Sequence, residues 1–272
     1  MVNDNNYYFR IQNIFVMIIL FFLYFIILYN MEDYPNISIA TPLFNRTKWR
    51  PLMISNILNL HYPKEKLEWV IFDSYDRHEE DWDLFFKNDR EVKEMENLLG
   101  IKIKYIKSIT SYSIGEKRNK ITKEATHKII GNMDSDDVMV GSWLKHSIDI
   151  MRSDKRCGIV GTPEMVFCFP DDDYKLTGIS CPDKRMSHEA AMLYTKKHWR
   201  SMGGFKKKGF GEGTSMIDFN EKSCLTSKAQ DCIICICHDS NTVNKDRFRE
   251  HIIPEAKLGR KIIVILDEIL SK

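Results

Sequence analysis

Apolar and polar positions along the chain follow two periods, one typical of strands and one typical of helices. Apolar segments that end at turn or acidic residues predict strands at 37–43, 67–74, 101–107 and 128–134. Helical spacing and capping residues predict helices at 49–60, 82–99, 113–127 and 142–151. Strands that alternate with helices of this length predict parallel β-α-β units, and therefore an α/β domain.

Local signals support several of these boundaries. Ser113 and Glu116 form the S-x-x-E pattern of a capping box, Gly100 follows the helix at 82–99, and Ser142 is placed to cap the last helix. The segment 101–107, IKIKYIK, alternates strictly between apolar and basic residues. We therefore expect it to be a strand with one solvated face, near an edge of the sheet.

The first apolar segment does not fit this alternation. Residues 14–29, IFVMIILFFLYFIILY, contain no charged residue, glycine or proline. As a helix they would extend about 24 Å, slightly less than the ~30 Å hydrocarbon core of a bilayer. The residues that follow carry no small-residue cleavage site. We expect an uncleaved single-span membrane anchor at 14–29, after a short tail at 1–13 and before a linker at 30–36.

Composition and cysteine usage narrow the class of protein. The 272 residues are 43% hydrophobic and 29% charged, with a formal net charge of +2, which supports a sizeable core and argues against a nucleic-acid binder. The seven cysteines are scattered through apolar stretches, so we expect free thiols rather than a disulfide framework. The run DCIICICH contains a C-x-x-C, but its alternation of Cys235 and Cys237 with isoleucine favours a buried strand over a zinc site.

Polar residues gather where three of the predicted strands end. They are the segment 41–46, Asp73, and the acidic run at 134–137 in IIGNMDSDDVM. Ligands of parallel α/β sheets bind at the carboxyl ends of the strands. The acidic run has two interpretations, a solvated turn or a site at which Asp134 and Asp136 offer oxygen ligands to Mg²⁺ or Mn²⁺. Neither common glycine-rich phosphate loop is present.

In order and spacing, several short segments resemble the family 2 glycosyltransferases, which have the GT-A nucleotide-sugar-binding fold. The segments are ISIATPLFNR, VIFDS, IGEKRN, NMDSDD, GGF, FGEG and CICHDSNT. The resemblance covers about residues 37–248 and implies a single GT-A domain with a mixed, mostly parallel central sheet. Residues 249–272 would then form a C-terminal helical extension.

The resemblance implies roles for residues on the donor side. The loop after the first strand would pack on the nucleotide base, and Asp73 would accept a hydrogen bond from the base, which favours uracil. Arg118 would face the donor from the start of a helix. The remaining implied donor contacts are Thr41, Pro42, Phe44, Asn45, Asn119 and Asp134.

The resemblance also implies a metal site. Asp136 would be the main ligand of Mn²⁺ or Mg²⁺, and Asp134 would lie near the ribose and the metal. His238, which follows a late predicted strand, would contact the metal or the pyrophosphate. Each of these residues also has an ordinary structural interpretation, such as a turn acid for Asp73 or a loop histidine for His238.

One departure from the family pattern concerns the catalytic base. Many family members have Glu-Asp where this chain has Glu212-Gly213, and the aspartate is usually the base. Glu212 is the nearest replacement, and Asp218 is the second candidate. The segment 187–199, SHEAAMLYTKKHW, could line the sugar and acceptor side, although we favour a core strand that leads into a helix.

The resemblance therefore implies an inverting, metal-dependent transfer of a sugar, with UDP as the expected carrier, to a glycan, glycoprotein or glycolipid acceptor. The missing aspartate keeps open a catalytically degenerate, membrane-anchored nucleotide-sugar-binding protein. A sugar-1-phosphate nucleotidyltransferase is the weaker alternative, because it would need a glycine-rich loop after the first strand.

The side of the membrane on which the domain lies is a separate question. The unpaired cysteines suit a reducing compartment, and Asn45 begins a glycosylation sequon inside the loop expected to cover the base. Both observations favour a domain that faces the cytosol.

Overall fold

The computed structural model describes residues 16–21, 34–74, 84–181, 183–217, 223–241, 243–251 and 258–270. The chain forms two compact units, 1–35 and 36–272. Within the first, residues 16–21 are helical. None of the helices in the ranges above is long and apolar enough to cross a membrane. Most of the segment 14–29 falls outside those ranges, so the anchor stays a prediction.

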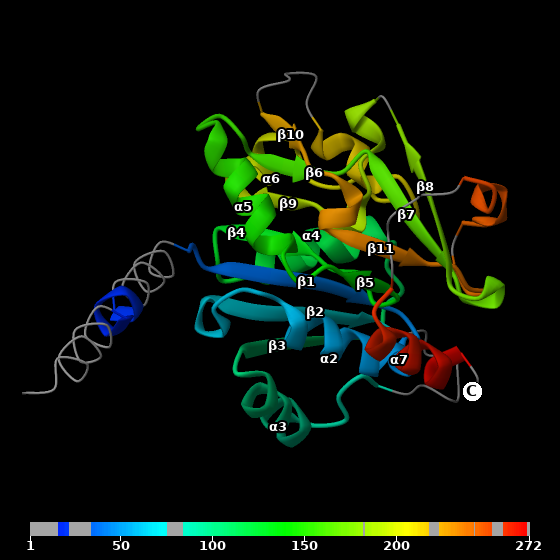
Figure 1. The fold of residues 1–272 in the computed structure, drawn as a ribbon, viewed down its shortest axis with the longest axis horizontal. Helices are drawn as coiled ribbons and strands as arrows, with labels where there is room; N and C mark the ends of the chain where they lie inside the picture. The colour runs from blue at the N-terminus through cyan, green and yellow to red at the C-terminus, as the bar shows by residue number, and fades with distance from the viewer. Residues whose placement is uncertain are drawn as a thin grey trace, which may run out of the picture. The chain divides into compact units, whose positions relative to one another are not determined.

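The second unit is built on a mixed sheet of seven strands in the order β10-β6-β9-β4-β1-β2-β3 (Figure 1). Only β9 runs antiparallel to its neighbours, β4 and β6, and the other pairings in this sheet are parallel. The prediction of a mixed, mostly parallel sheet is confirmed. The strands are β1 (Ile37–Leu43), β2 (Leu67–Ser74), β3 (Lys102–Ser108), β4 (Ile129–Asn132), β6 (Ile159–Gly161), β9 (Leu193–Thr195) and β10 (Cys224–Thr226).

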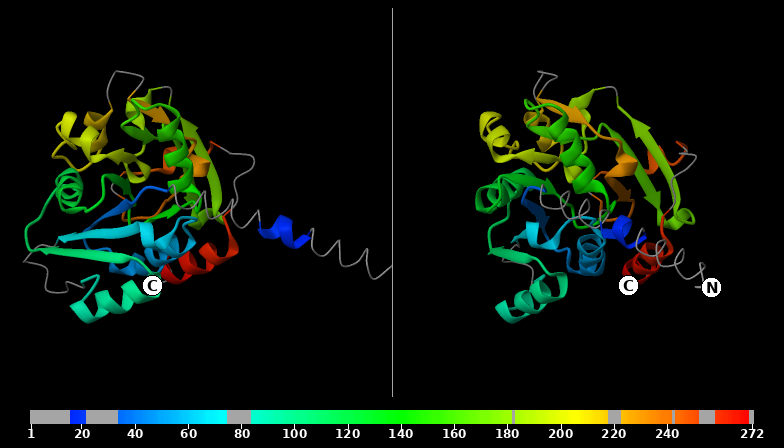
Figure 2. Two further views of the ribbon diagram at one scale, coloured as in Figure 1. Left: turned by 90° about the vertical axis from the view of Figure 1, so that its left-hand side faces the viewer. Right: turned by 60° about the vertical axis from the view of Figure 1, so that its left-hand side comes forward.

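Helices cover both faces of this sheet. Figure 2 shows α4 and α6 on one face and α2 and α5 on the other. Every residue of β1 and β2 is buried as a result, as expected for parallel strands between two helical layers. The helices are α2 (Arg50–Asn59), α3 (Asp89–Leu99), α4 (Ile114–Glu124), α5 (Trp143–Ser153), α6 (Lys196–Ser201) and α7 (Arg260–Leu270).

A second sheet of four strands has the order β5-β11-β7-β8. Its strands are β5 (Asp137–Met139), β7 (Glu164–Phe169), β8 (Lys175–Ser180) and β11 (Ile233–Ile236). The antiparallel pairing of β5 with β11 sets Asp137 opposite Cys235. The acidic run before β5 and the loop that follows β11 are thereby brought to the same place.

The helix predicted at 82–99 is corrected by the structure. The residues from 84 to 88 are not helical, and α3 begins only at Asp89. Asn88 caps α3, because its side chain accepts a hydrogen bond from the backbone N–H of Glu91. Before this cap, Phe85 and Phe86 turn into the core and lie fully buried, and the N–H of Phe85 donates to Asp73. Burial of two aromatic rings outweighs helix propensity at these positions.

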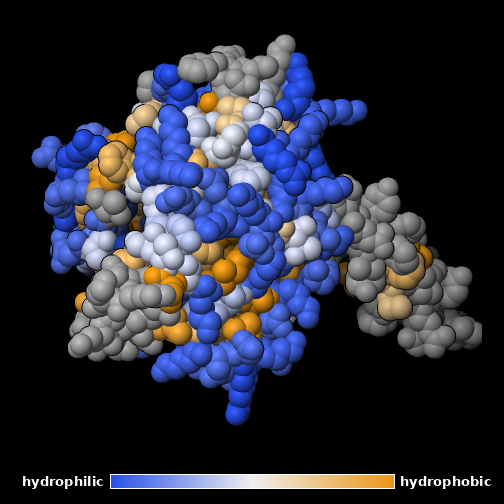
Figure 3. Space-filling view, turned by 180° about the vertical axis from the view of Figure 1, so that it is seen from behind, coloured by the Kyte–Doolittle hydropathy of each residue, from blue (hydrophilic) through white to orange (hydrophobic). Residues whose placement is uncertain are grey.

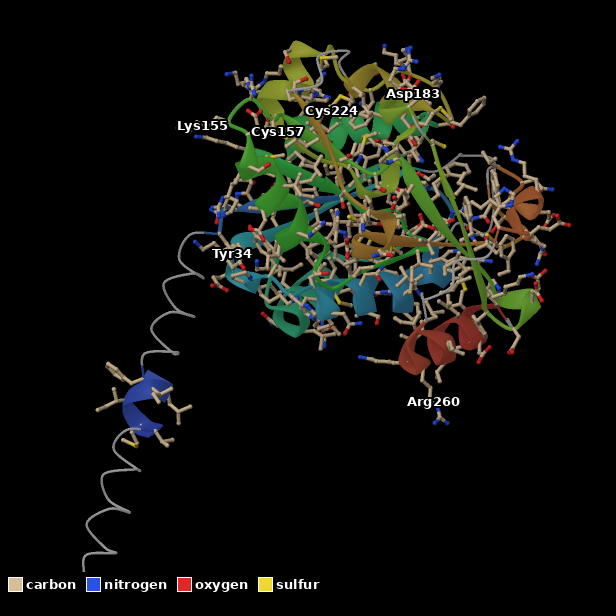
Figure 4. The ribbon with its side chains drawn as sticks, turned by 45° about the horizontal axis from the view of Figure 1, so that its top comes forward. Tyr34, Lys155, Cys157, Asp183, Cys224 and Arg260 are labelled. Carbon is tan, nitrogen blue, oxygen red and sulfur yellow. The ribbon has the colours of Figure 1, made fainter. Side chains whose placement is uncertain are left out.

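The remaining strand and helix predictions agree with the structure to within a few residues. The segment 101–107 gives β3, which lies at the edge of the sheet and alternates between exposed and partly buried residues. The fourth strand is shorter than predicted and ends at Asn132, so the acidic run lies beyond it. The C-terminal segment contains α7, which packs on α2 through Leu266 and Ile269, while Arg260 points away from the domain (Figure 4).

The cysteines and the surface complete the description. All seven cysteines are free, as predicted. Cys224 is the first residue of β10, and Cys157 lies two residues before the partner strand β6 (Figure 4). On the face seen in Figure 3, hydrophilic residues predominate and apolar residues gather in limited areas. Phe44 and Phe210 are among the exposed aromatic side chains, at 39% and 67%.

The capping box of α4 gives a first test of the local energetics. Ser113 accepts from the N–H of Glu116, whose carboxylate accepts from the N–H of Ser113. Ser142 occupies the same position before α5 but makes no such bond. We expect Ser113→Ala to lower the free energy of unfolding by about 1 kcal/mol and Ser142→Ala to have a much smaller effect. Urea denaturation of both variants measures this, and equal losses would contradict it.

Candidate active site

A cleft opens beyond the ends of β1 and β4. Its volume is about 350 Å³, and it lies between the loop after β1, the start of α4 and the acidic run. This is the sheet edge at which the sequence predicts ligand binding. Its lining includes Pro42, Leu43, Phe44, Arg46, Ser111, Tyr112, Ser113, Ile114, Lys117, Asp134, Ser135, Asp136 and Gly209.

The three aspartates of the acidic run have three different environments. Asp134 forms an ion pair with Arg118 at 2.9 Å. Oδ2 of Asp136 lies 3.1 Å from Nε2 of His238. Asp137 is buried on β5 and accepts a hydrogen bond from the N–H of Ile236. The run is therefore not the solvated turn that was the simpler alternative.

Asp136 and His238 form the best candidate for a metal-binding pair. Asn241 accepts from the N–H of His238 through Oδ1, which sets its amide nitrogen 2.9 Å from Nε2 of the imidazole. Nε2 of the imidazole also lies 3.1 Å from Oδ2 of Asp136. The two atoms can share a hydrogen bond, and an imidazole nitrogen and a carboxylate oxygen at this separation are also ligand types of a divalent cation.

The electrostatics of the pair agree with this view. Burial alone would raise the pKa of Asp136, but its contacts with His238 and Arg46 outweigh burial and hold the pKa below its usual value. The guanidinium of Arg46 lies 3.7 Å from Asp136 and also donates to Ser240. Asp136 is therefore ionised at neutral pH, as a metal ligand has to be.

Asp134 does not complete this pair, because its carboxylate turns toward Arg118. Burial and the like charges of Asp136 and Glu212 raise the pKa of Asp134 despite the opposing effect of Arg118. Its Oδ1 lies 2.9 Å from Nη2 of Arg118, and its Oδ2 accepts a hydrogen bond from the same nitrogen at 3.0 Å. The structure thus joins Asp136 with His238 and leaves the predicted metal role of Asp134 a prediction.

A second group of potential ligand atoms lies behind the acidic run. Atoms of Asp137, His188 and Cys235 lie within 4.8 Å of one another. Burial raises the pKa of Asp137 to about 8, raises that of Cys235 well above its usual value and lowers that of His188 to about 3. In the absence of an ion, burial thus favours the neutral form of the thiol, the carboxyl group and the imidazole, as in a buried polar cluster.

Arg118 is the buried centre of the site. Its side chain is 1% exposed, donates from Nε to Glu212 at 2.9 Å and pairs with Asp134 through Nη2. Arg118 lies on α4, one turn after Gly115, where a Cβ would come within 1.8 Å of the carbonyl oxygen of Lys206. Glycine at 115 therefore lets the 206–212 loop approach α4 closely, which brings Glu212 to Arg118.

The residues predicted to contact the nucleotide base differ in their burial and in their contacts. Pro42 and Phe44 line the cleft, and Asn45 is exposed with a positive φ of 49°. The hydroxyl of Thr41 is buried and accepts from the indole N–H of Trp69. Asp73 is buried and accepts from the hydroxyl of Tyr105 at 2.6 Å, in addition to its bond from Phe85.

Asn119 lies away from the cleft. Its side chain holds the backbone of Phe205 by two hydrogen bonds, and its Oδ1 also accepts from the indole of Trp199. The residue lines a separate depression with Lys120 and Trp199. This geometry gives Asn119 a clear structural task, the anchoring of the GGF turn, and its predicted donor contact stays a prediction.

Two basic residues of the cleft are missing from the prediction. Lys117 is 4% exposed, donates to the carbonyl oxygen of Leu43 and lies 4.8 Å from the ring centroid of Phe44. Burial lowers its pKa to about 8. The other is Arg46. Both residues stand inside the quoted segments IGEKRN and ISIATPLFNR, but nothing in their spacing marks the direction of their side chains.

The sequence matches glycosyl transferase family 2 over residues 38–229. The chain belongs to this family. This match confirms the resemblance described above. No curated protein matches the chain.

Solved glycosyltransferases share the fold. The mannosyltransferase PcManGT from Pyrobaculum calidifontis, in complex with GDP-Man and Mn²⁺, has 16% identity and a TM-score of 0.57, over 79% of this chain and 59% of that one. TarS 1–349 of S. aureus in complex with UDP-GlcNAc has 13% identity and a TM-score of 0.55, over 76% of this chain and 60% of that one. The present chain thus spans about three fifths of the length of these solved chains. At such sequence identities the similarity shows the fold alone.

The two candidates for the base differ in what the structure says of them. Glu212 begins a 3-10 turn at Glu212–Met216, is 3% exposed and is held by Arg118. Asp218 lies outside the described residues. The assignment of the base to either residue stays a prediction.

The buried ion pairs of Arg118 yield a stability test. Arg118→Met keeps much of the side-chain volume but leaves Glu212 buried without its cation, so we expect a loss of about 3–5 kcal/mol in the free energy of unfolding. Arg90→Met is the control, because Arg90 forms an exposed pair with Glu94 on α3 and should change stability little. Chemical denaturation measures both, and similar values for the two variants would contradict this account.

Proposed function

We propose that this protein transfers a sugar from a nucleoside-diphosphate sugar to an acceptor hydroxyl, with inversion and with dependence on Mn²⁺ or Mg²⁺. The observation that carries the proposal is the Asp136–His238 pair beside the cleft at the ends of β1 and β4. A cleft at this edge suits a nucleotide, and the paired oxygen and nitrogen ligands suit a divalent cation beside its phosphates.

Different residues of the chain would contact the cation, the base and the phosphates of the donor. Asp136 and His238 would hold the cation, which when bound supplies Lewis-acid stabilisation of the leaving diphosphate. Phe44 and Pro42 offer apolar contacts to a base. The amine of Lys117 and the guanidinium of Arg46 would place positive charge near the phosphates.

We also propose which nucleotide the donor carries. A uridine donor is our first choice, because the family resemblance implies that Asp73, near the end of β2, accepts a hydrogen bond from uracil. The solved structures of similar fold include one with GDP-Man and one with UDP-GlcNAc. Both nucleotides should therefore be compared in binding assays.

The acceptor and the membrane are also proposals. We expect a glycan, glycoprotein or glycolipid acceptor, and a chain held at a membrane through 14–29 with its domain in the cytosol. Protease protection on sealed vesicles tests the orientation. A domain that resists protease until detergent is added, and that carries a glycan at Asn36, would contradict it.

A degenerate nucleotide-sugar-binding protein is the second candidate. The observation that favours it is Gly213, which has no side chain at the position where many relatives have their base. Turnover of a nucleotide sugar with Mn²⁺ present separates the enzyme from the binding protein.

The cation site yields a direct prediction. Asp136→Asn replaces a carboxylate ligand by a neutral amide, so we expect loss of Mn²⁺-dependent binding of UDP and GDP and loss of turnover. Isothermal titration with and without a chelator measures the binding. Asp183→Asn is the control, because Asp183 (Figure 4) pairs with its neighbour Arg185 in another loop.

Binding of nucleotide by the Asp136→Asn variant that remains as tight as wild type and insensitive to chelator would overturn the metal assignment.

A further inference from the structure

A second glutamate lies beside the residue that lacks the expected carboxylate. A Cβ built on Gly213 would come within 2.5 Å of Cγ and 3.1 Å of Oε1 of Glu189, and within 2.9 Å of Cε of Met192. The N–H of Gly213 donates to Oε1 of Glu189 at 3.1 Å. The side chain of Glu189 therefore fills the space that a side chain at 213 would occupy.

The fold holds Glu189 in this place from two sides. It begins a 3-10 turn at Glu189–Ala191 that leads into β9, and its backbone carbonyl accepts from the side chain of Asn132 at the end of β4. Its carboxylate is fixed by the backbone of the 3-10 turn that carries Glu212. A residue on the segment between β8 and β9 is thus positioned against the 212–216 turn and the end of β4.

Glu189 and Glu212 differ in their freedom to accept a proton. Glu212 is 3% exposed and committed to the guanidinium of Arg118. Glu189 is partly exposed, and no described residue forms an ion pair with its carboxylate. A general base has to reach its substrate and to lack a permanent cation at the accepting oxygen.

We propose that Glu189 is the catalytic base of this enzyme, in place of the missing side chain at 213. Glu212 then acts as a positioning residue, which balances Arg118 and holds the turn against Glu189. This inference rests on the proposed function, because a base is needed only where an acceptor hydroxyl is activated.

The proposed reaction is a single displacement at the anomeric carbon of the donor. Glu189 takes the proton of the acceptor hydroxyl as the acceptor oxygen bonds to the anomeric carbon of the donor. The bond from that carbon to the diphosphate oxygen breaks at the same time, and its electron pair leaves with the nucleoside diphosphate. Attack from the face opposite the leaving group inverts the anomeric centre.

The surroundings of Glu189 support this role. Burial and the negative charge of Glu212 raise the pKa of Glu189 to about 7, while the nearby Arg118 opposes the shift. A carboxylate with a pKa near neutral is a stronger base than an ordinary glutamate and is still ionised in a large fraction of molecules at pH 7.

The experiment compares Glu189→Gln with Glu164→Gln. Glu164, on β7, is also partly exposed and also accepts one backbone N–H, from Ala229, so it is a matched control. In the Glu189→Gln variant the new amide oxygen can still accept from the N–H of Gly213. Turnover is measured with UDP-N-acetylglucosamine and GDP-mannose in the presence of Mn²⁺, and nucleotide affinity is measured by titration with UDP and GDP.

We expect Glu189→Gln to lower kcat by about 10²–10⁴-fold with unchanged nucleotide affinity, while Glu164→Gln behaves as wild type. Turnover by Glu189→Gln close to wild type would overturn the inference, as would a matching loss of nucleotide affinity, which indicates a structural role. Wild type that neither binds UDP or GDP with Mn²⁺ nor turns over a donor would overturn the proposed function itself.

A second pair of variants tests whether a carboxylate at position 213 can replace the one at position 189. Glu189→Ala removes the carboxylate, and Gly213→Asp added to it places a new carboxylate in the vacated space. We expect the double variant to regain turnover relative to Glu189→Ala. A folded double variant with unchanged nucleotide affinity but no recovery would contradict the claim that a carboxylate in this space acts as the base.

Discussion

The site depends above all on one buried cation. Arg118 is 1% exposed, and its guanidinium balances Asp134 at the end of β4 and Glu212 in the 212–216 turn. A buried guanidinium without these partners would cost several kcal/mol in desolvation. Since its partners come from segments far apart in the chain, the pairs also fix how α4, the acidic run and the 206–212 loop sit together.

The second sheet determines where His238 lies. Pairing of β5 with β11 and of β11 with β7 brings the loop after β11 beside the acidic run. His238 then meets Asp136, and Asn241 and Ser240 orient its ring from the same loop. The large sheet therefore carries the cleft, and the small sheet supplies the imidazole beside it.

The sequence predicted the elements better than the contacts between them. Buried strands such as ISIATPL and LEWVIFDS can be predicted from the sequence, because strands between two helical layers are largely apolar. The late start of α3 was missed because burial of Phe85 and Phe86 depends on the neighbouring Trp69 and Tyr105. The relation between Glu189 and Gly213 could not be predicted either, since it joins residues 24 positions apart through tertiary packing.

The most direct test of the account is the position of the metal. Crystals grown with Mn²⁺ and UDP, measured at the manganese absorption edge, locate the ion by its anomalous signal. We predict a peak within coordination distance of both Oδ2 of Asp136 and Nε2 of His238, with UDP in the cleft beside Phe44. A peak among Asp137, His188 and Cys235, or UDP bound with no manganese near Asp136, would contradict it.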